Sequence, residues 1–119
     1  MKITERDRDV YTDGLCWSLA WEISDMTGLP VATAGSHLWG WSHVLVHIGY
    51  NQYLDITGIN TKKNLRWWGE KVVIVGTFPT FEEYTNALCR DAEGFNQKDN
   101  QHARTVKLAE QLIKDYIHA

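Results

Sequence analysis

A loop that runs into an amphipathic helix is the feature that most constrains this chain. The stretch reads Asp13-Gly14-Leu15-Cys16-Trp17-Ser18-Leu19-Ala20, and Gly28 and Pro30 end the helical pattern. The core-facing stripe consists of Cys16, Leu19, Ala20, Ile23 and Met26. Because the first backbone N–H groups of a helix favour negative charge, a cysteine at this position is favoured as a thiolate.

The position of Cys16 leaves two interpretations open. A reactive cysteine fits a helix start, but free cysteine is also among the most buried residue types and would occupy the same stripe as a structural residue. A nucleophile needs a base and a group to orient that base. The chain offers His43, His47 and Asp55 as candidates for these roles.

The two histidines and Asp55 lie on a predicted β-hairpin. A β-branched run, His43–Ile48, is followed by a turn and by a second apolar segment, Tyr53–Ile56. Alternation puts both histidines on one face. A three-residue loop would leave Asp55 diagonal to both of them, so spacing alone does not choose the base.

The remaining segments predict an α+β chain. Residues 1–12 are polar and predict an irregular or short-strand lead-in, anchored by Val10 and Tyr11. The further elements that we expect are a short strand and a Trp-containing loop over 31–42, a short helix over 61–68, a central strand over 71–75, and helices over 80–94 and 106–117. Neither a repeat nor a second-domain linker is visible, so we expect one domain over 1–119.

Composition narrows the classes of partner and compartment. The chain has 119 residues, a net charge of −3 and no basic stripe, which argues against nucleic acid. We expect no membrane partner, because no apolar run approaches the roughly 20 residues of a membrane span. The first residues lack the apolar core of a signal peptide, and the two cysteines, Cys16 and Cys89, suit a reducing compartment, so we expect a cytoplasmic protein.

The tryptophans indicate a contact surface. Six Trp in a short chain is a high number, and indoles are rarely fully buried. Trp39 and Trp41 flank Gly40 just before the histidine strand, where they would form the wall of a substrate cleft or cap the core. We take Trp17, Trp39, Trp41 and His47 as candidate substrate-binding residues.

Two motifs resemble those of a known superfamily. Gly14-Leu15-Cys16-Trp17-Ser18-Leu19-Ala20 resembles the nucleophile segment of the transglutaminase-like branch of the papain-like fold, and Gly28-Leu29-Pro30 is similar to the end of its helix. His43-Val44-Leu45-Val46, with Asp55 on the next strand, resembles the histidine strand of that branch and of NlpC-type cell-wall peptidases. Tyr53-Leu54-Asp55-Ile56-Thr57-Gly58 is similar to a segment of small bacterial and phage proteins with the same Cys-His-Asp order.

The resemblance implies a fold and a set of roles. It implies a papain-like core with an N-terminal nucleophile helix, a small antiparallel sheet and C-terminal helices. It also implies Cys16 as nucleophile, His43 rather than His47 as base, and Asp55 as the orienting carboxylate. No glutamine precedes Cys16, so the oxyanion-hole glutamine of papain has no counterpart, and the short spacing from Cys16 to His43 argues against protein crosslinking.

Three functional hypotheses follow from the sequence. The first is a small thiol hydrolase or acyltransferase, peptidase- or amidase-like, that acts on a peptide- or amide-like substrate without a cofactor. The second is a non-catalytic protein-binding module, encoded by a phage or mobile element, with a Trp-rich surface. The third is a zinc site; its ligands would be Cys16, His43, His47 and Asp55, but their spacing is unusual for zinc, and we expect no metal.

Overall fold

The computed structural model describes residues 1–12, 15–36, 40–67, 70–71, 73–79, 83 and 101–118, and of residues 36, 40–42, 66–67, 70–71 and 73–76 it describes the backbone. This part of the chain is a small α+β fold, as expected. The helices are α1 (Glu5–Thr12), α2 (Cys16–Thr27), α4 (His102–Leu112) and the π-helical turn η2 (Ile113–Ile117). The strands are β1 (Val31–Ser36), β2 (Gly40–Gly49), β3 (Gln52–Asp55), β4 (Gly58–Asn60), β5 (Arg66–Trp67), β6 (Glu70–Lys71) and β7 (Val73–Phe78).

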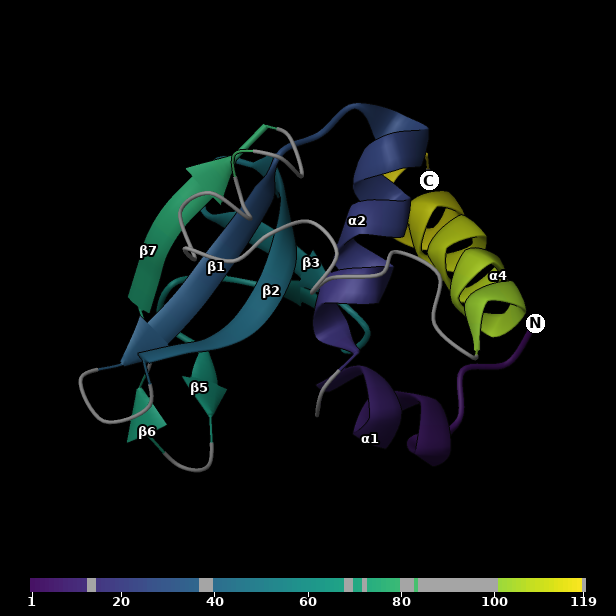
Figure 1. The fold of residues 1–119 in the computed structure, drawn as a ribbon, viewed down its shortest axis with the longest axis horizontal. Coiled ribbons are helices and arrows are strands. Elements are labelled where there is room, and N and C mark those ends of the chain that lie inside the picture. Colours follow the sequence, from purple (N-terminus) through teal and green to yellow (C-terminus); the bar gives the residue numbers. More distant parts are fainter. Residues whose placement is uncertain are drawn as a thin grey trace.

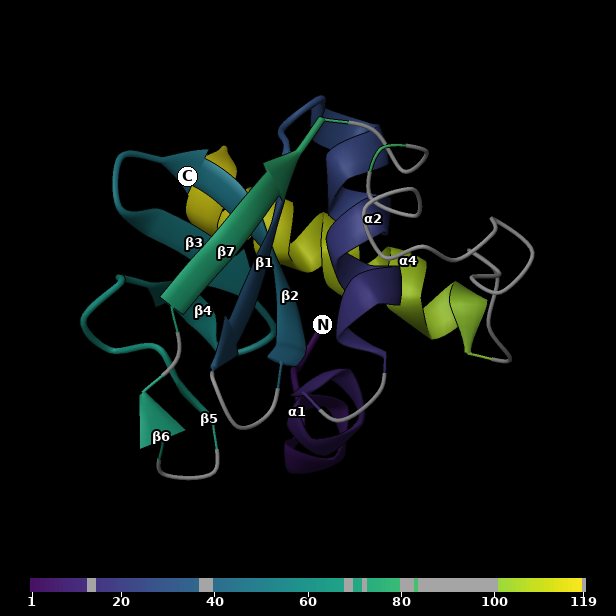
Figure 2. The ribbon, with the colours of Figure 1, turned by 60° about the vertical axis from the view of Figure 1, so that its left-hand side comes forward.

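Among the described residues, five strands form one antiparallel sheet in the order β4-β3-β2-β1-β7, and β5 and β6 form a separate ribbon (Figures 1 and 2). The strand predicted over 71–75 corresponds to β6 and β7. Its apolar sequence suggested a central position, but β7 is outermost in the described sheet and pairs with β1. Apolar composition reports burial of a strand's faces and not its place in the hydrogen-bonded order, which explains the error.

Helix α2 is central to the core. It lies between the sheet and α4 (Figure 1), and contacts β2 on one side and α4 on the other. The predicted core-facing stripe of this helix is therefore partly wrong. It omitted Trp21, which is 3% exposed, and it included Met26, which is 42% exposed. The helix ends as predicted at Gly28, which has a φ of 77°.

No helix within the described ranges is long and apolar enough to span a membrane.

The N-terminal segment corrects the prediction of an irregular or short-strand lead-in. Residues Glu5–Thr12 form α1, and a reciprocal pair of hydrogen bonds caps it: Asp7 N–H donates to Thr4 Oγ1, and Thr4 N–H donates to Asp7 Oδ2. Tyr11 is a core residue, as we expected, and is 1% exposed. The segment lacks apolar periodicity, which is why the helix was missed.

Three other predictions meet different outcomes. The short helix over 61–68 was wrong, because residues 62–64 form a turn and Arg66–Trp67 form β5. The C-terminal helix is confirmed in α4 and η2. Its buried side carries Thr105, Leu108, Ala109, Leu112 and Ile113, and Tyr116 is 40% exposed. The helix predicted over 80–94, which includes Cys89, lies outside the described residues apart from Glu83.

Candidate active site

Cys16 is the first residue of α2, and Leu15 is the N-cap. The helix starts there because the Leu15 carbonyl accepts the Leu19 N–H at 3.3 Å, which closes the first turn. The thiol side chain is half-buried and packs at the margin of the main core cluster. Cys16 thus lies at the start of the helix and remains partly accessible, in contrast to the fully buried Ile23 in the same helix.

The β2–β3 register determines which histidine approaches Asp55. The turn has two residues, Tyr50 and Asn51, and the strand carries an irregularity between His47 and Gly49. The extra residue therefore lies in the strand instead of the loop that we predicted. Both arrangements give the same pairing further along, with Val46 opposite Leu54.

The structure separates the two histidines that the spacing left equivalent. His43 Nε2 lies 2.7 Å from Asp55 Oδ2, and both side chains are buried. His47 lies opposite Tyr53 across the strands and stacks on its ring, with a centroid distance of 4.8 Å and an interplanar angle of 15°. His47 is therefore engaged by an aromatic ring, while His43 has the carboxylate.

The second oxygen of Asp55 is also held. Oδ1 accepts hydrogen bonds from the backbone N–H of Thr57 (2.8 Å), the Thr57 hydroxyl (2.5 Å) and the side-chain amide of Asn60 (3.1 Å). Sequence reasoning missed Thr57 and Asn60. An aspartate two residues before a threonine, followed by glycine, is a pattern typical of a side-chain-to-backbone turn and could have signalled Thr57. No local pattern signals Asn60, which reaches Asp55 only because β4 folds back on β3.

Electrostatics couple these groups to the thiol. Burial by itself lowers the pKa of His43, but hydrogen bonds from its ring to Asp55 and Cys16, and the charges of both groups, raise that pKa to about 9. Burial raises the pKa of Asp55, while hydrogen bonds from His43 and Thr57 and the charge of His43 outweigh it, so the net pKa is lowered. Both shifts favour a protonated imidazole beside an ionised carboxylate.

Cys16, His43 and Asp55 therefore form one contiguous line across α2, β2 and β3. The imidazole is in the middle, with the carboxylate on Nε2 and the Cys16 side chain within hydrogen-bonding reach of the ring. Since Nε2 is taken by Asp55, Nδ1 is the nitrogen that remains for the sulfur. A thiol, an imidazole and a carboxylate in this sequence can transfer a proton and generate a thiolate.

The predicted substrate-binding residues are not all brought to this line. Trp17 is half-buried and packs against the main core cluster. Trp41 lies in β2 opposite Gly35, and the structure describes only its backbone. Trp39 lies outside the described residues. His47 stacks on Tyr53 as described above. In the part of the chain that the structure describes, no group of three or more His, Cys, Asp or Glu side chains converges as metal ligands would.

Comparison of the chain with protein-family models, with curated proteins and with solved structures finds no match. The class that the site defines therefore comes from its chemistry: a buried histidine between a half-buried thiol and a multiply hydrogen-bonded carboxylate.

Proposed function

We propose that this protein is a small thiol hydrolase or acyltransferase that acts on a peptide- or amide-like acyl group, with Cys16 as nucleophile, His43 as acid–base and Asp55 as the orienting carboxylate. One observation carries the proposal: the imidazole of buried His43 lies 2.7 Å from Asp55 and also contacts Cys16. The order of a nucleophile helix followed by antiparallel strands with histidine and aspartate further supports a papain-like core, in line with the motif resemblance.

The chemistry follows from the positions of the three side chains. The Cys16 thiolate attacks the carbonyl carbon, and a C–S bond forms as the carbonyl π pair moves to oxygen. The oxyanion returns its pair, the C–N bond breaks, and imidazolium His43 donates its Nδ1 proton to the leaving amine. The product of this half-reaction is a thioester on Cys16.

The second half-reaction restores the enzyme. His43 takes a proton from water, or from an acceptor amine, as that nucleophile attacks the thioester. The C–S bond then breaks, the electron pair returns to sulfur, and a carboxylic acid or a new amide leaves. The backbone N–H of Cys16 at the start of α2 is one donor for the oxyanion.

The first test is thiol alkylation. With iodoacetamide at pH 6, Cys16 should react at least about tenfold faster than Cys89, because ordinary thiols are mostly protonated well below a pKa of about 8.5. His43→Ala should abolish this advantage. His47→Ala is the matched control, since it removes a histidine of the same strand that stacks on Tyr53, whereas His43 is the histidine that contacts Asp55.

The second test is acylation. Incubation with an activated acyl ester should add one acyl group to Cys16 by mass spectrometry, and Cys16→Ala should remain unmodified at that position. Equal alkylation of the two cysteines at pH 6, together with no acyl adduct, would contradict the proposal and favour the protein-binding module.

A further inference from the structure

Asp55 makes more hydrogen bonds than the orientation of one imidazole requires. Oδ2 is hydrogen-bonded to His43, whereas Oδ1 accepts hydrogen bonds from Thr57 and Asn60. The torsion that turns a carboxylate about its own axis is soft, and a single contact with His43 would leave it free to swing. Donors on the opposite oxygen fix the plane of the carboxylate and therefore the direction from which it meets Nε2.

Local structure ties these donors to the strand pair. The Asp55 side chain accepts the N–H two residues ahead, a turn that directs the chain from β3 into β4. Asn60 then lies opposite Tyr53, and its amide donates to Asp55 Oδ1 at 3.1 Å, to the Gly58 carbonyl at 3.1 Å and to the Tyr53 carbonyl at 3.4 Å. The β3–β4 hairpin and the carboxylate thus form a single hydrogen-bonded unit.

We infer that Thr57 and Asn60 are positioning residues, which hold the Asp55 carboxylate so that His43 presents Nδ1 to the Cys16 sulfur. The inference rests on the proposed function for its chemical meaning. Neither residue touches the thiol; each acts through Asp55, which in turn acts through His43.

The arrangement also has an electrostatic consequence. A buried carboxylate would tend to take up a proton, and a protonated Asp55 would no longer stabilise imidazolium His43. Hydrogen bonds from the Thr57 hydroxyl and N–H are among the contacts that lower the pKa of Asp55 against its burial. Asn60 contributes direction, because its amide spans Asp55 and two backbone carbonyls.

The test uses the variants Thr57→Val and Asn60→Ala. Their matched controls are Thr61→Val and Asn64→Ala, because Thr61 and Asn64 form a similar turn, with Thr61 N–H donating to Asn64 Oδ1 at 2.6 Å, and neither bonds to Asp55. Two quantities are measured in each folded variant: the His43 pKa by imidazole NMR, and the rate of Cys16 alkylation at pH 6.

We expect the His43 pKa to fall from about 9 toward 6.5 in both test variants, since the carboxylate is less firmly held. Alkylation of Cys16 should slow roughly five- to tenfold, with the smaller loss at the exposed Thr57. Thr57→Ser keeps the hydroxyl and should restore both values, and the two controls should match the wild type.

The outcomes separate this inference from the proposed function. If wild-type Cys16 reacts no faster than Cys89, the proposed function fails, but the His43 titration in the variants still decides whether Thr57 and Asn60 position Asp55. Wild-type values of both quantities in folded Thr57→Val and Asn60→Ala would overturn the inference. Should Asn60→Ala not fold, Thr57→Val decides alone, because it leaves the backbone N–H bond to Oδ1 in place.

Discussion

At the scale of single residues, the two carboxylate oxygens of Asp55 have different partners. One oxygen orients His43, and the other anchors the turn into β4. A substitution at this position therefore acts on reactivity and on stability together, and the two effects can be separated only by replacements that keep one oxygen.

Asp55→Asn is that replacement. The donors on Oδ1 require an oxygen there, so the amide NH₂ should face His43 Nε2 and donate to it. The ring then carries its remaining proton on Nδ1, the nitrogen that has to accept the thiol proton. We expect the alkylation advantage of Cys16 at pH 6 to disappear, as in His43→Ala, with only a small change in melting temperature.

Asp55→Ala should lose the same reactivity and also destabilise the fold, by about 2–4 kcal/mol, because it leaves buried His43 and the donors of Thr57 and Asn60 without an acceptor. Urea denaturation measures that loss. Retained reactivity in Asp55→Asn would mean that the amide adopts the opposite orientation, and the assignment of Nδ1 to the sulfur would then be wrong.

At the scale of elements, the β3–β4 hairpin depends on Gly58. Its φ of 111° is a conformation that residues with a Cβ rarely adopt, and a Cβ there would come within 2.9 Å of the Tyr116 hydroxyl. Because Tyr116 is 40% exposed, its ring can move aside. The backbone conformation, rather than the contact, is thus the larger constraint at this position.

Gly58→Ala should therefore cost about 1–3 kcal/mol in the free energy of unfolding, and adding Tyr116→Ala should not recover it. Gly28→Ala is the matched control: its φ of 77° lies in the left-handed region, and nothing lies within 4 Å of the added Cβ, so its cost should be closer to 1 kcal/mol. Full recovery in the double variant would show that the Tyr116 contact dominates.

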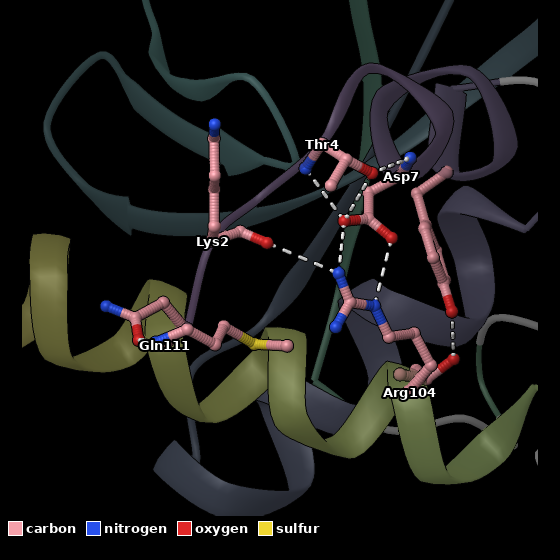
Figure 3. A network of polar contacts seen from close by, with 8 residues as sticks. Lys2, Thr4, Asp7, Arg104 and Gln111 are labelled. Carbon is pink, nitrogen blue, oxygen red and sulfur yellow. Dashed lines mark hydrogen bonds and ion pairs between the residues drawn. The ribbon is translucent and has the colours of Figure 1, made fainter.

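At the scale of the molecule, the two ends of the chain are joined by polar contacts. The Arg104 guanidinium of α4 donates to both oxygens of Asp7 in α1 (Figure 3). The hydroxyls of Tyr11 and Thr105 lie 2.6 Å apart in the core. These contacts hold α1 against α4, which in turn packs on α2.

The Asp7–Arg104 pair should make stability depend on acid pH. The Arg104 hydrogen bond is the largest cause that lowers the pKa of Asp7, which falls from 3.8 to about 2. A depressed carboxyl pKa adds stability that is present above pH 3.8 and is lost as the pH falls through 2. Asp7→Asn should lower the free energy of unfolding by about 2 kcal/mol at pH 7 and by almost nothing at pH 2.

Urea denaturation at several pH values measures this difference. Glu5→Gln is the control, since it removes the charge of an ion pair with Arg8 in which the Glu5 side chain is 86% exposed. This substitution should change the free energy of unfolding by less than about 0.5 kcal/mol at any pH. A penalty for Asp7→Asn that stays constant from pH 7 to pH 2 would contradict the role of the charge.

The sequence by itself determined the features that depend on neighbours along the chain. The apolar spacing and Gly28 define α2 with Cys16 at its start, and the β-branched run before the turn defines β2 and β3. The capping pair of Thr4 and Asp7 was also readable, although α1 was missed because a polar helix has no apolar period.

Only the tertiary structure decided which distant groups meet. It chose His43 over His47, because the cross-strand register sets His47 against the Tyr53 ring and brings Asp55 to His43. It brought Asn60 to Asp55 through β4, and put the apolar β7 outermost in the described sheet. The physical reason is that sequence periodicity specifies the faces of an element, whereas register and strand order arise from packing between elements far apart in the chain.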